Sequence, residues 1–144
     1  MNSREFEKCL ERGRIKKFPK AKTLVSSEIK LAGEDLQTAN GSFGEENYKW
    51  ATIQAYYSMF HTARALLYAK GYREKSHFCL IESIRALYVS KGLLNFKFVE
   101  TLKLGKSLRE NADYYGDFSE DGAGEMIASA GEFLKEAKKI LRKK

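Results

Sequence analysis

The side chains best suited to proton transfer or phosphate binding gather near the middle of the chain. Residues 55–77 read AYYSMFHTARALLYAKGYREKSH and contain both histidines, His61 and His77. Arg73 and Lys75 stand just before His77, where a turn joins two expected helices. These cations could hold a phosphate at the N-terminus of the following helix, and a neutral histidine could act as a base on a ribose hydroxyl. A solvated basic turn, with His77 packed in the first helical turn, explains the same residues without a ligand.

A second group of polar side chains lines one face of the helix expected over residues 45–69. Its members are three or four positions apart, so they form one continuous stripe: Gln54, Tyr57, His61, Arg64 and Tyr68. Tyrosine and arginine are enriched at protein interfaces, whereas a solvated helix face usually carries lysine and glutamate. The stripe therefore predicts either an interface or ligand-binding face, for which we expect a homodimer interface, or partly buried residues that are hydrogen-bonded to adjacent helices.

A third candidate is the stretch LRENADYY, residues 108–115. Arg109 carries a guanidinium that can donate two parallel hydrogen bonds to a phosphate. Asp113 and Tyr114 follow it on adjoining faces of an expected helix. Because Arg109 and Asp113 are four positions apart, an intrahelical ion pair worth roughly 0.2–0.5 kcal/mol is the ordinary explanation.

The spacing of the potential metal ligands argues against a metal centre. The two histidines are sixteen positions apart, and the chain has neither an HExxH motif nor a closely spaced cysteine pair. It also lacks the GxxxxGK[ST] and GxGxxG loops that hold nucleotide phosphates. We therefore predict neither a metal nor a cofactor.

Length and hydropathy indicate one domain that does not enter a membrane. The 144 residues are enough for a hydrophobic core. No apolar run approaches the roughly 20 residues needed to span a bilayer, and the N-terminus has no apolar signal core. We therefore expect a cytoplasmic protein. Cys9 and Cys79 are too few for a disulfide framework, so we expect both to be reduced.

Positive charge is concentrated at the two ends of the chain. The net charge is +7, but residues 1–30 and residues 135–144 each carry a net +5, which leaves −3 for the residues between them. Basic ends could bind a polyanion at the margins of the domain. The same pattern is explained equally well if the basic ends only keep the protein soluble.

Hydrophobic periodicity predicts helices throughout the chain. Apolar residues recur at spacings of three and four, and Asn40-Gly41 or single glycines separate the periodic segments. Pro19 suits the first turn of a helix, and Ser76 can cap another. No segment reads convincingly as a strand.

We predict an all-α fold, an antiparallel up-and-down bundle of four to five long helices plus a short N-terminal helix. A single domain is expected over residues 1–144, with a charged segment at 1–18 and the bundle at 19–142. Helices are expected near residues 2–17, 19–40, 45–69, 76–90, 95–115 and 119–142.

Taken together, the motifs resemble the HEPN domain superfamily, and most closely its small stand-alone prokaryotic members. The resemblance rests on residues 55–77, on LRENADYY some thirty residues later and on the closing FLKEAKKIL, and it covers residues 20–142. It implies an antiparallel helical bundle, a homodimer with a cleft between the protomers, and an association with RNA or nucleotides. It also implies a minimal nucleotidyltransferase as partner protein in a toxin–antitoxin module, where the HEPN protein is often a metal-independent ribonuclease.

One residue departs from the pattern that active HEPN ribonucleases carry. In that pattern an arginine is followed, after four to six residues, by a histidine; the arginine holds the phosphate and the histidine transfers protons. Arg109 matches the arginine, but Tyr114 stands where the histidine is expected, and no histidine follows His77. Tyrosine has an ordinary pKa of about 10, which makes it a poor proton shuttle near neutral pH.

We therefore expect a dimeric RNA- or nucleotide-associated module rather than an active enzyme. Its expected ligand-binding residues are Arg73, Lys75, His77, Arg109, Asp113 and Tyr114. Two alternatives stay open. One is a metal-independent endoribonuclease that uses Arg109 with His61 or His77, and the other is an interaction protein without catalysis.

Overall fold

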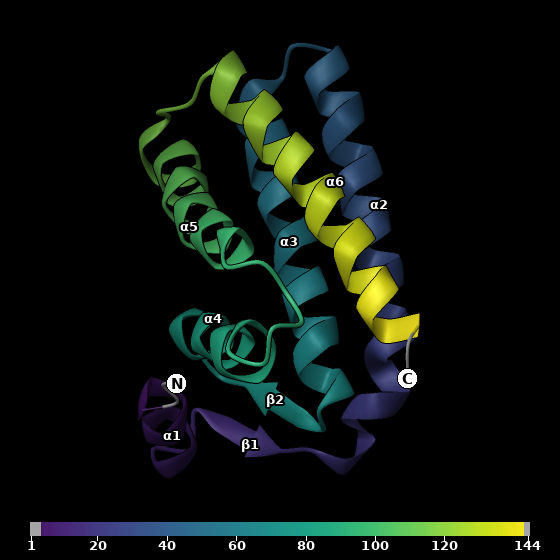
Figure 1. The fold of residues 1–144 in the computed structure, drawn as a ribbon. Helices are drawn as coiled ribbons and strands as arrows, with labels where there is room; N and C mark the ends of the chain where they lie inside the picture. Colours follow the sequence, from purple (N-terminus) through teal and green to yellow (C-terminus); the bar gives the residue numbers. More distant parts are fainter. Residues whose placement is uncertain (1–3, 143–144) are drawn as a thin grey trace.

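The computed structural model describes residues 4–142, which form a helical bundle (Figure 1). The main helices are α2 (Val25–Gly44), α3 (Tyr48–Ala69), α4 (His77–Ile84), α5 (Lys97–Tyr115) and α6 (Glu120–Arg142). A short helix α1 (Arg4–Glu11) precedes them, a 3-10 segment η1 (Pro19–Leu24) leads into α2, and a π-helical turn η2 (Arg85–Val89) extends α4. The predicted helical-bundle fold class is confirmed. None of the helices in residues 4–142 is long and apolar enough to cross a membrane.

Helix α3 lies at the centre of the bundle and contacts α2, α4, α5 and α6. Five residues, four of them small or flexible, recur at spacings of three or four along α3 and therefore share one face, against which a neighbouring helix can pack closely. All five of these residues are buried in the core: Ala51, Ala55, Met59, Ala63 and Leu66. Small side chains let α2 and α6 run close beside α3, as Figure 1 shows.

Helix α5 approaches α3 at a glycine. A Cβ atom on Gly105 would lie 2.9 Å from Cε of Met59 and 3.2 Å from the ring of Tyr56, closer than buried carbon atoms normally pack. Because Gly105 has no side chain, α5 can approach Tyr56 on α3 closely. Arg109, one turn further along α5, is carried over the same ring.

Several predicted helix boundaries are confirmed. Pro19 begins η1, and Oγ of Ser76 accepts a hydrogen bond of 3.1 Å from the backbone N–H of Cys79 at the start of α4. The predicted end of the second helix at Asn40-Gly41 is wrong, because α2 continues to Gly44. The Asn40 amide donates to the carbonyl of Leu36 inside the helix, so it supports the helix instead of ending it.

The predicted N-terminal helix is wrong beyond Glu11, where α1 ends. Gly13 takes a positive φ of 71° and turns the chain. The following residues form strand β1 (Ile15–Lys17), which pairs antiparallel with β2 (Tyr72–Glu74), so the expectation of no strand is also wrong. Ile15 is 1% exposed, and its burial fixes this two-stranded ribbon to the bundle. Residues 2–3 of the predicted helix lie outside the described residues.

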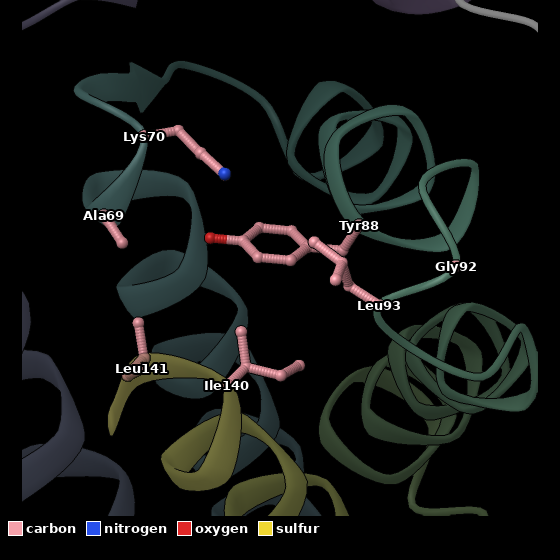
Figure 2. A pocket seen from close by; sticks show the side chains of 7 residues that line it. All are labelled: Ala69, Lys70, Tyr88, Gly92, Leu93, Ile140 and Leu141. Carbon is pink, nitrogen blue, oxygen red and sulfur yellow. The ribbon is translucent and has the colours of Figure 1, made fainter. Parts of the chain in front are cut away.

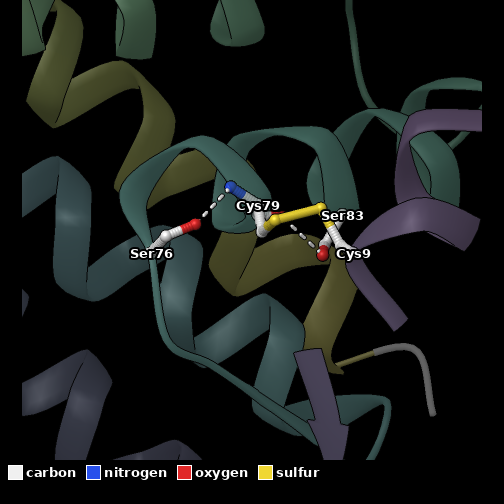
Figure 3. The surroundings of a disulfide bond; sticks show 4 residues. All are labelled: Cys9, Ser76, Cys79 and Ser83. Atoms are coloured by element: carbon white, nitrogen blue, oxygen red, sulfur yellow. Dashed lines mark hydrogen bonds between the residues drawn. A yellow bond between two sulfur atoms is a disulfide. The ribbon is translucent and has the colours of Figure 1, made fainter. Parts of the chain in front are cut away.

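Cys9 and Cys79 form a disulfide, which overturns the expectation that both are reduced (Figure 3). The packing of α1 against α4 brings their Cα atoms to 5.8 Å, within the range that a disulfide spans. The two residues are separated by 70 positions, and no sequence pattern indicates that α1 returns to the start of α4. The disulfide therefore ties the N-terminal helix to the segment that carries His77.

Candidate phosphate-binding site

The guanidinium of Arg109 lies among three tyrosine rings. Its Cζ is 5.7 Å from the ring centroids of Tyr56, Tyr57 and Tyr114, and Nη1 donates a long hydrogen bond of 3.4 Å to the Tyr114 hydroxyl. The ion pair with Asp113 is present at 3.7 Å. The side chain is only 9% exposed, and its Nε has no acceptor within residues 4–142. A buried, charged donor without an acceptor costs free energy, so Nε of Arg109 is a strained feature of this side chain.

His77, the first residue of α4, lies against one of the same tyrosines. Its Nδ1 is 2.8 Å from the Tyr56 hydroxyl, and its ring stacks on Phe60 with 4.8 Å between centroids. Burial, together with the charges of Arg109 and Lys106, lowers the pKa of His77 from its ordinary value of 6.5. Burial raises the pKa of Tyr56 to about 12. At neutral pH His77 is therefore uncharged and Tyr56 keeps its proton.

The hydrogen bond between Tyr56 and His77 assigns the proton on the imidazole. Tyr56 is 1% exposed, and Nδ1 of His77 is the only partner of its hydroxyl within residues 4–142. A buried O–H that donated to nothing would cost free energy, so the hydroxyl donates to Nδ1 and the proton of neutral His77 resides on Nε2. Neutral His77 thus offers an N–H donor, and its remaining lone pair is already engaged.

The structure brings His77 to Arg109 but leaves His61 elsewhere. Nδ1 of His61 is 2.7 Å from a carboxylate oxygen of Glu28, and its Nε2 is 3.7 Å from Asp35, both on α2. Of the two histidines considered as partners of Arg109, His77 alone belongs to the cluster that we define as Arg109, His77, Tyr56, Tyr57 and Tyr114 and call the Arg109–His77 cluster.

The polar stripe on α3 makes hydrogen bonds within the chain. The amide of Gln54 is 2.8 Å from the Ser42 hydroxyl, and Nη2 of Arg64 donates to Glu74 at 2.7 Å. Together with the His61–Glu28 contact, these bonds match the interpretation of partly buried residues bonded to adjacent elements. Tyr68 is buried as well. The use of this stripe as a homodimer interface stays a prediction.

A separate pocket of about 360 Å³ lies between the end of α3, the residues after η2 and the end of α6 (Figure 2). Lys70 extends toward Tyr88, and its Nζ is 5.2 Å from the centre of that ring. The rest of the wall is mainly apolar: Ala69, Gly92, Leu93, Ile140 and Leu141. This pocket shares no residue with the Arg109–His77 cluster. Within residues 4–142, no three His, Cys, Asp or Glu side chains are placed to hold a metal ion.

Sequence reasoning missed Tyr56, the residue that joins the two halves of the cluster. It belongs to the segment AYYSMFH, but its neighbour Tyr57, not Tyr56, falls on the polar stripe. The available signal was chemical: a tyrosine beside the buried Ala55 has a hydroxyl that needs a hydrogen-bond partner inside the protein. The sequence does not show that this partner lies 21 positions away.

The fold and the cluster define a helical-bundle domain in which an arginine and a histidine from different helices meet at a buried tyrosine. The chain belongs to the HEPN domain family, whose model matches residues 25–141. The match begins at the first residue of α2, so α1, β1 and η1 precede the matched part of the chain.

Relatives of similar length come from archaea. The chain is 31% identical over 119 residues to a protein named "Putative toxin" from Methanocaldococcus jannaschii, covering 82% of this chain and 89% of the relative. A second protein named "Putative toxin" from the same organism is 25% identical over 115 residues, 78% of each chain. A "UPF0332 protein" from Archaeoglobus fulgidus is 30% identical over 119 residues, covering 80% of this chain and 93% of the relative.

Proposed function

We propose that this chain is the toxin-type component of a toxin–antitoxin-like pair, a homodimeric cytoplasmic module that binds RNA or a nucleotide. Its partner protein would be a minimal nucleotidyltransferase. One observation carries the proposal: the charged guanidinium of Arg109 and the imidazole of His77, from different helices, meet at Tyr56. The names of two relatives support the toxin class.

The two donors suit a phosphate in different ways. Arg109 supplies a permanent positive charge and a forked set of donors. Neutral His77 supplies one directional N–H from Nε2 without adding charge. Tyr114 is 65% exposed, and its ring offers a surface on which a base can stack. Asp113 and Glu110 lie at the margin and limit the positive charge of the site.

A metal-independent endoribonuclease is the second candidate, favoured by the proximity of His77 to Arg109. In such a reaction the 2′-hydroxyl loses a proton and attacks phosphorus, and the departing 5′-oxygen gains a proton. Neutral His77 is a poor source of the second proton, because loss of Nε2–H would leave an imidazolate, and burial lowers the pKa of His77 and so disfavours the imidazolium. A group with a free lone pair must take the first, and Nδ1 of His77 is occupied by the Tyr56 hydroxyl. Binding without cleavage is therefore the better supported function.

Fluorescence anisotropy with a short labelled single-stranded RNA, in EDTA, tests the proposal. Arg109→Gln should weaken binding by about tenfold or more, because a hydrogen bond to a charged group is worth roughly 1.5–3 kcal/mol. Arg85→Gln is a matched control, since Arg85 also lies over an aromatic ring, that of Phe96, and also pairs with a carboxylate. Equal RNA binding by the native protein and Arg109→Gln would refute the proposal.

The same samples separate the two candidates. The native protein should leave the RNA intact. Cleavage in EDTA that is lost in His77→Ala would establish the ribonuclease instead. The proposed pair is examined by co-expressing the chain with a nucleotidyltransferase encoded beside it. Failure to co-purify would remove that part of the proposal without affecting RNA binding.

A further inference from the structure

The β1–β2 ribbon has a buried face and a fully charged outer face. In the antiparallel register Ile15 lies opposite Glu74, and both side chains are buried. Successive strand residues point to opposite faces, so the residues on either side of this pair point outward. Lys16 in β1 and Arg73 in β2 point outward, together with Arg14 just before β1 and Lys75 just after β2. All four are exposed and form the outer face.

These four cations face one another without neutralising partners. Lys16 lies directly opposite Arg73, and the backbone N–H of Lys75 donates to the carbonyl of Arg14. The adjacent charge of Lys16 lowers the pKa of Lys75. Within residues 4–142 no carboxylate forms an ion pair with any of the four. The nearest strand carboxylate, Glu74, points inward and pairs with Arg64.

Like charges directly opposite one another destabilise a two-stranded ribbon. The ribbon is retained by interactions on its other side, namely the burial of Ile15 and the disulfide between Cys9 and Cys79. The four cations therefore form a concentrated positive charge that the buried Ile15 and the disulfide hold in place. Such a charge is complementary to a polyanion.

We propose that the outer face of the β1–β2 ribbon binds the phosphate backbone of an RNA strand that also occupies the Arg109–His77 cluster. This inference rests on the proposed function and names the surface that extends it. The two sites are contiguous, because only Ser76 separates Lys75 from His77. Two of the four cations, Arg14 and Lys16, come from outside residues 25–141, the part of the chain that the HEPN model matches.

RNA fits this surface better than an anionic membrane does. Membrane-surface segments combine basic residues with apolar side chains that enter the lipid. Here the apolar member of the ribbon, Ile15, points into the core, and the four outward side chains are all charged. Two aromatic rings lie next to these cations, too few to form an apolar face: Phe78, which is 55% exposed, lines a cavity together with Arg14, and the ring of Phe18 lies 5.1 Å from the Arg73 guanidinium. Such rings next to cations are typical of surfaces that bind single-stranded nucleic acid.

The test measures RNA affinity by anisotropy across a series of salt concentrations. Two double variants remove charge from either strand: Arg14→Gln with Lys16→Gln, and Arg73→Gln with Lys75→Gln. Each should reduce affinity about tenfold at low salt and lower the slope of log K against log salt by about 1.4, since each lost contact with a single strand contributes about 0.7. The matched control, Lys135→Gln with Lys138→Gln, removes the same charge from the exposed side of α6 and should change little.

A charge-preserving variant, Arg14→Lys with Lys16→Arg, separates electrostatics from folding and should bind like the native protein. If Arg109→Gln weakens binding while both ribbon variants behave like the α6 control, the ribbon inference is wrong and the proposed function stands. If the native protein binds no RNA, both are wrong. If the ribbon variants lose binding to phosphatidylserine vesicles but keep full RNA affinity, the surface is a membrane contact and the inference is overturned.

Discussion

The hydroxyl of Tyr56 lies 2.8 Å from Nδ1 of His77, and this single contact joins α3 to the first residue of α4. Because Tyr56 also lies beneath the guanidinium of Arg109, it holds the two candidate phosphate ligands in one place. The contact decides which imidazole nitrogen carries the proton, and it therefore decides whether His77 acts as a donor or as a base.

Replacing Tyr56 by Phe should remove the preference of His77 for the Nε2–H tautomer. Without the hydroxyl, nothing fixes the proton on Nε2, so the neutral imidazole should become a mixture of the two tautomers. Nitrogen-15 NMR of the histidine side chains measures the ratio. In the native protein His77 should be almost entirely in the Nε2–H form. Tyr57→Phe is the matched control and should leave the His77 signals unchanged; a mixture in the native protein would contradict the assignment.

Acid should destabilise the protein through His77. Burial, Arg109 and Lys106 lower its pKa in the folded state below the ordinary 6.5 that applies to the unfolded chain. The unfolded chain therefore binds more protons as the pH falls below about 6.5, so this contribution to stability is complete above that pH and is lost below it. Urea unfolding at a series of pH values should show a smaller acid-side loss in His77→Gln. An NMR titration in which Arg109→Met fails to raise the His77 pKa would show that the charge is not a cause.

Reduction of the disulfide should lower stability. A cross-link between positions 70 apart restricts the unfolded chain, which in the loop-entropy model amounts to about 4 kcal/mol. Urea unfolding of the native protein with and without a phosphine reductant should reveal a loss of roughly that size or somewhat less. The variant with Cys9→Ser and Cys79→Ser should match the reduced protein and be insensitive to the reductant. Equal stability in both conditions would show that the two thiols are not bonded.

The buried carboxylate of Glu74 depends on Arg64. The Glu74 side chain is 5% exposed, and its strongest contact is the 2.7 Å ion pair with that arginine. Arg64→Met should therefore destabilise the protein by about 3 kcal/mol, because it leaves a buried charge unpaired. Adding Glu74→Met should restore much of the loss, and a double-mutant cycle from urea unfolding measures the coupling. Additive losses would mean that the two side chains do not interact in solution.

Restoring a histidine at position 114 should confer cleavage. Tyr114→His returns the arginine–histidine spacing of active HEPN ribonucleases and places an imidazole near Arg109, beside the position now held by the Tyr114 hydroxyl. General acid–base catalysis contributes about 10² to 10⁴ in rate, so a gel assay in EDTA should detect a gain. Phe118→His, which follows Arg109 after eight residues and so lies outside the four-to-six spacing, is the control. Equal cleavage by the native protein and by Tyr114→His would contradict the expectation.

Local patterns were enough to predict the bundle. Spacings of three and four report on burial along one helix, and the five residues that share this spacing on α3 are all buried, although most of this central helix is buried as well. The errors concern contacts between distant segments. A three-residue strand such as Ile15–Lys17 is too short for alternation to stand out, and it forms only because β2 is available as its partner.

The candidate site was predicted in parts. Arg109 and His77 could each be chosen from residue type and motif, but their meeting depends on how closely α5 approaches α3 at Gly105. That approach depends on how helices pack in three dimensions, and the hydrophobic periodicity of a single helix does not predict it. The same limit explains why His61, equally plausible in sequence, lies against Glu28 instead.

The bond between Cys9 and Cys79 closes residues 9–79 into a covalent ring that includes α2 and α3. A protease that cut once inside this ring would produce two pieces still joined through sulfur. The basic strand β1, which lies within the ring, would remain attached to the helix that begins at His77. A single cut between β1 and His77, for example within α2 or α3, would therefore leave both segments covalently joined through the disulfide.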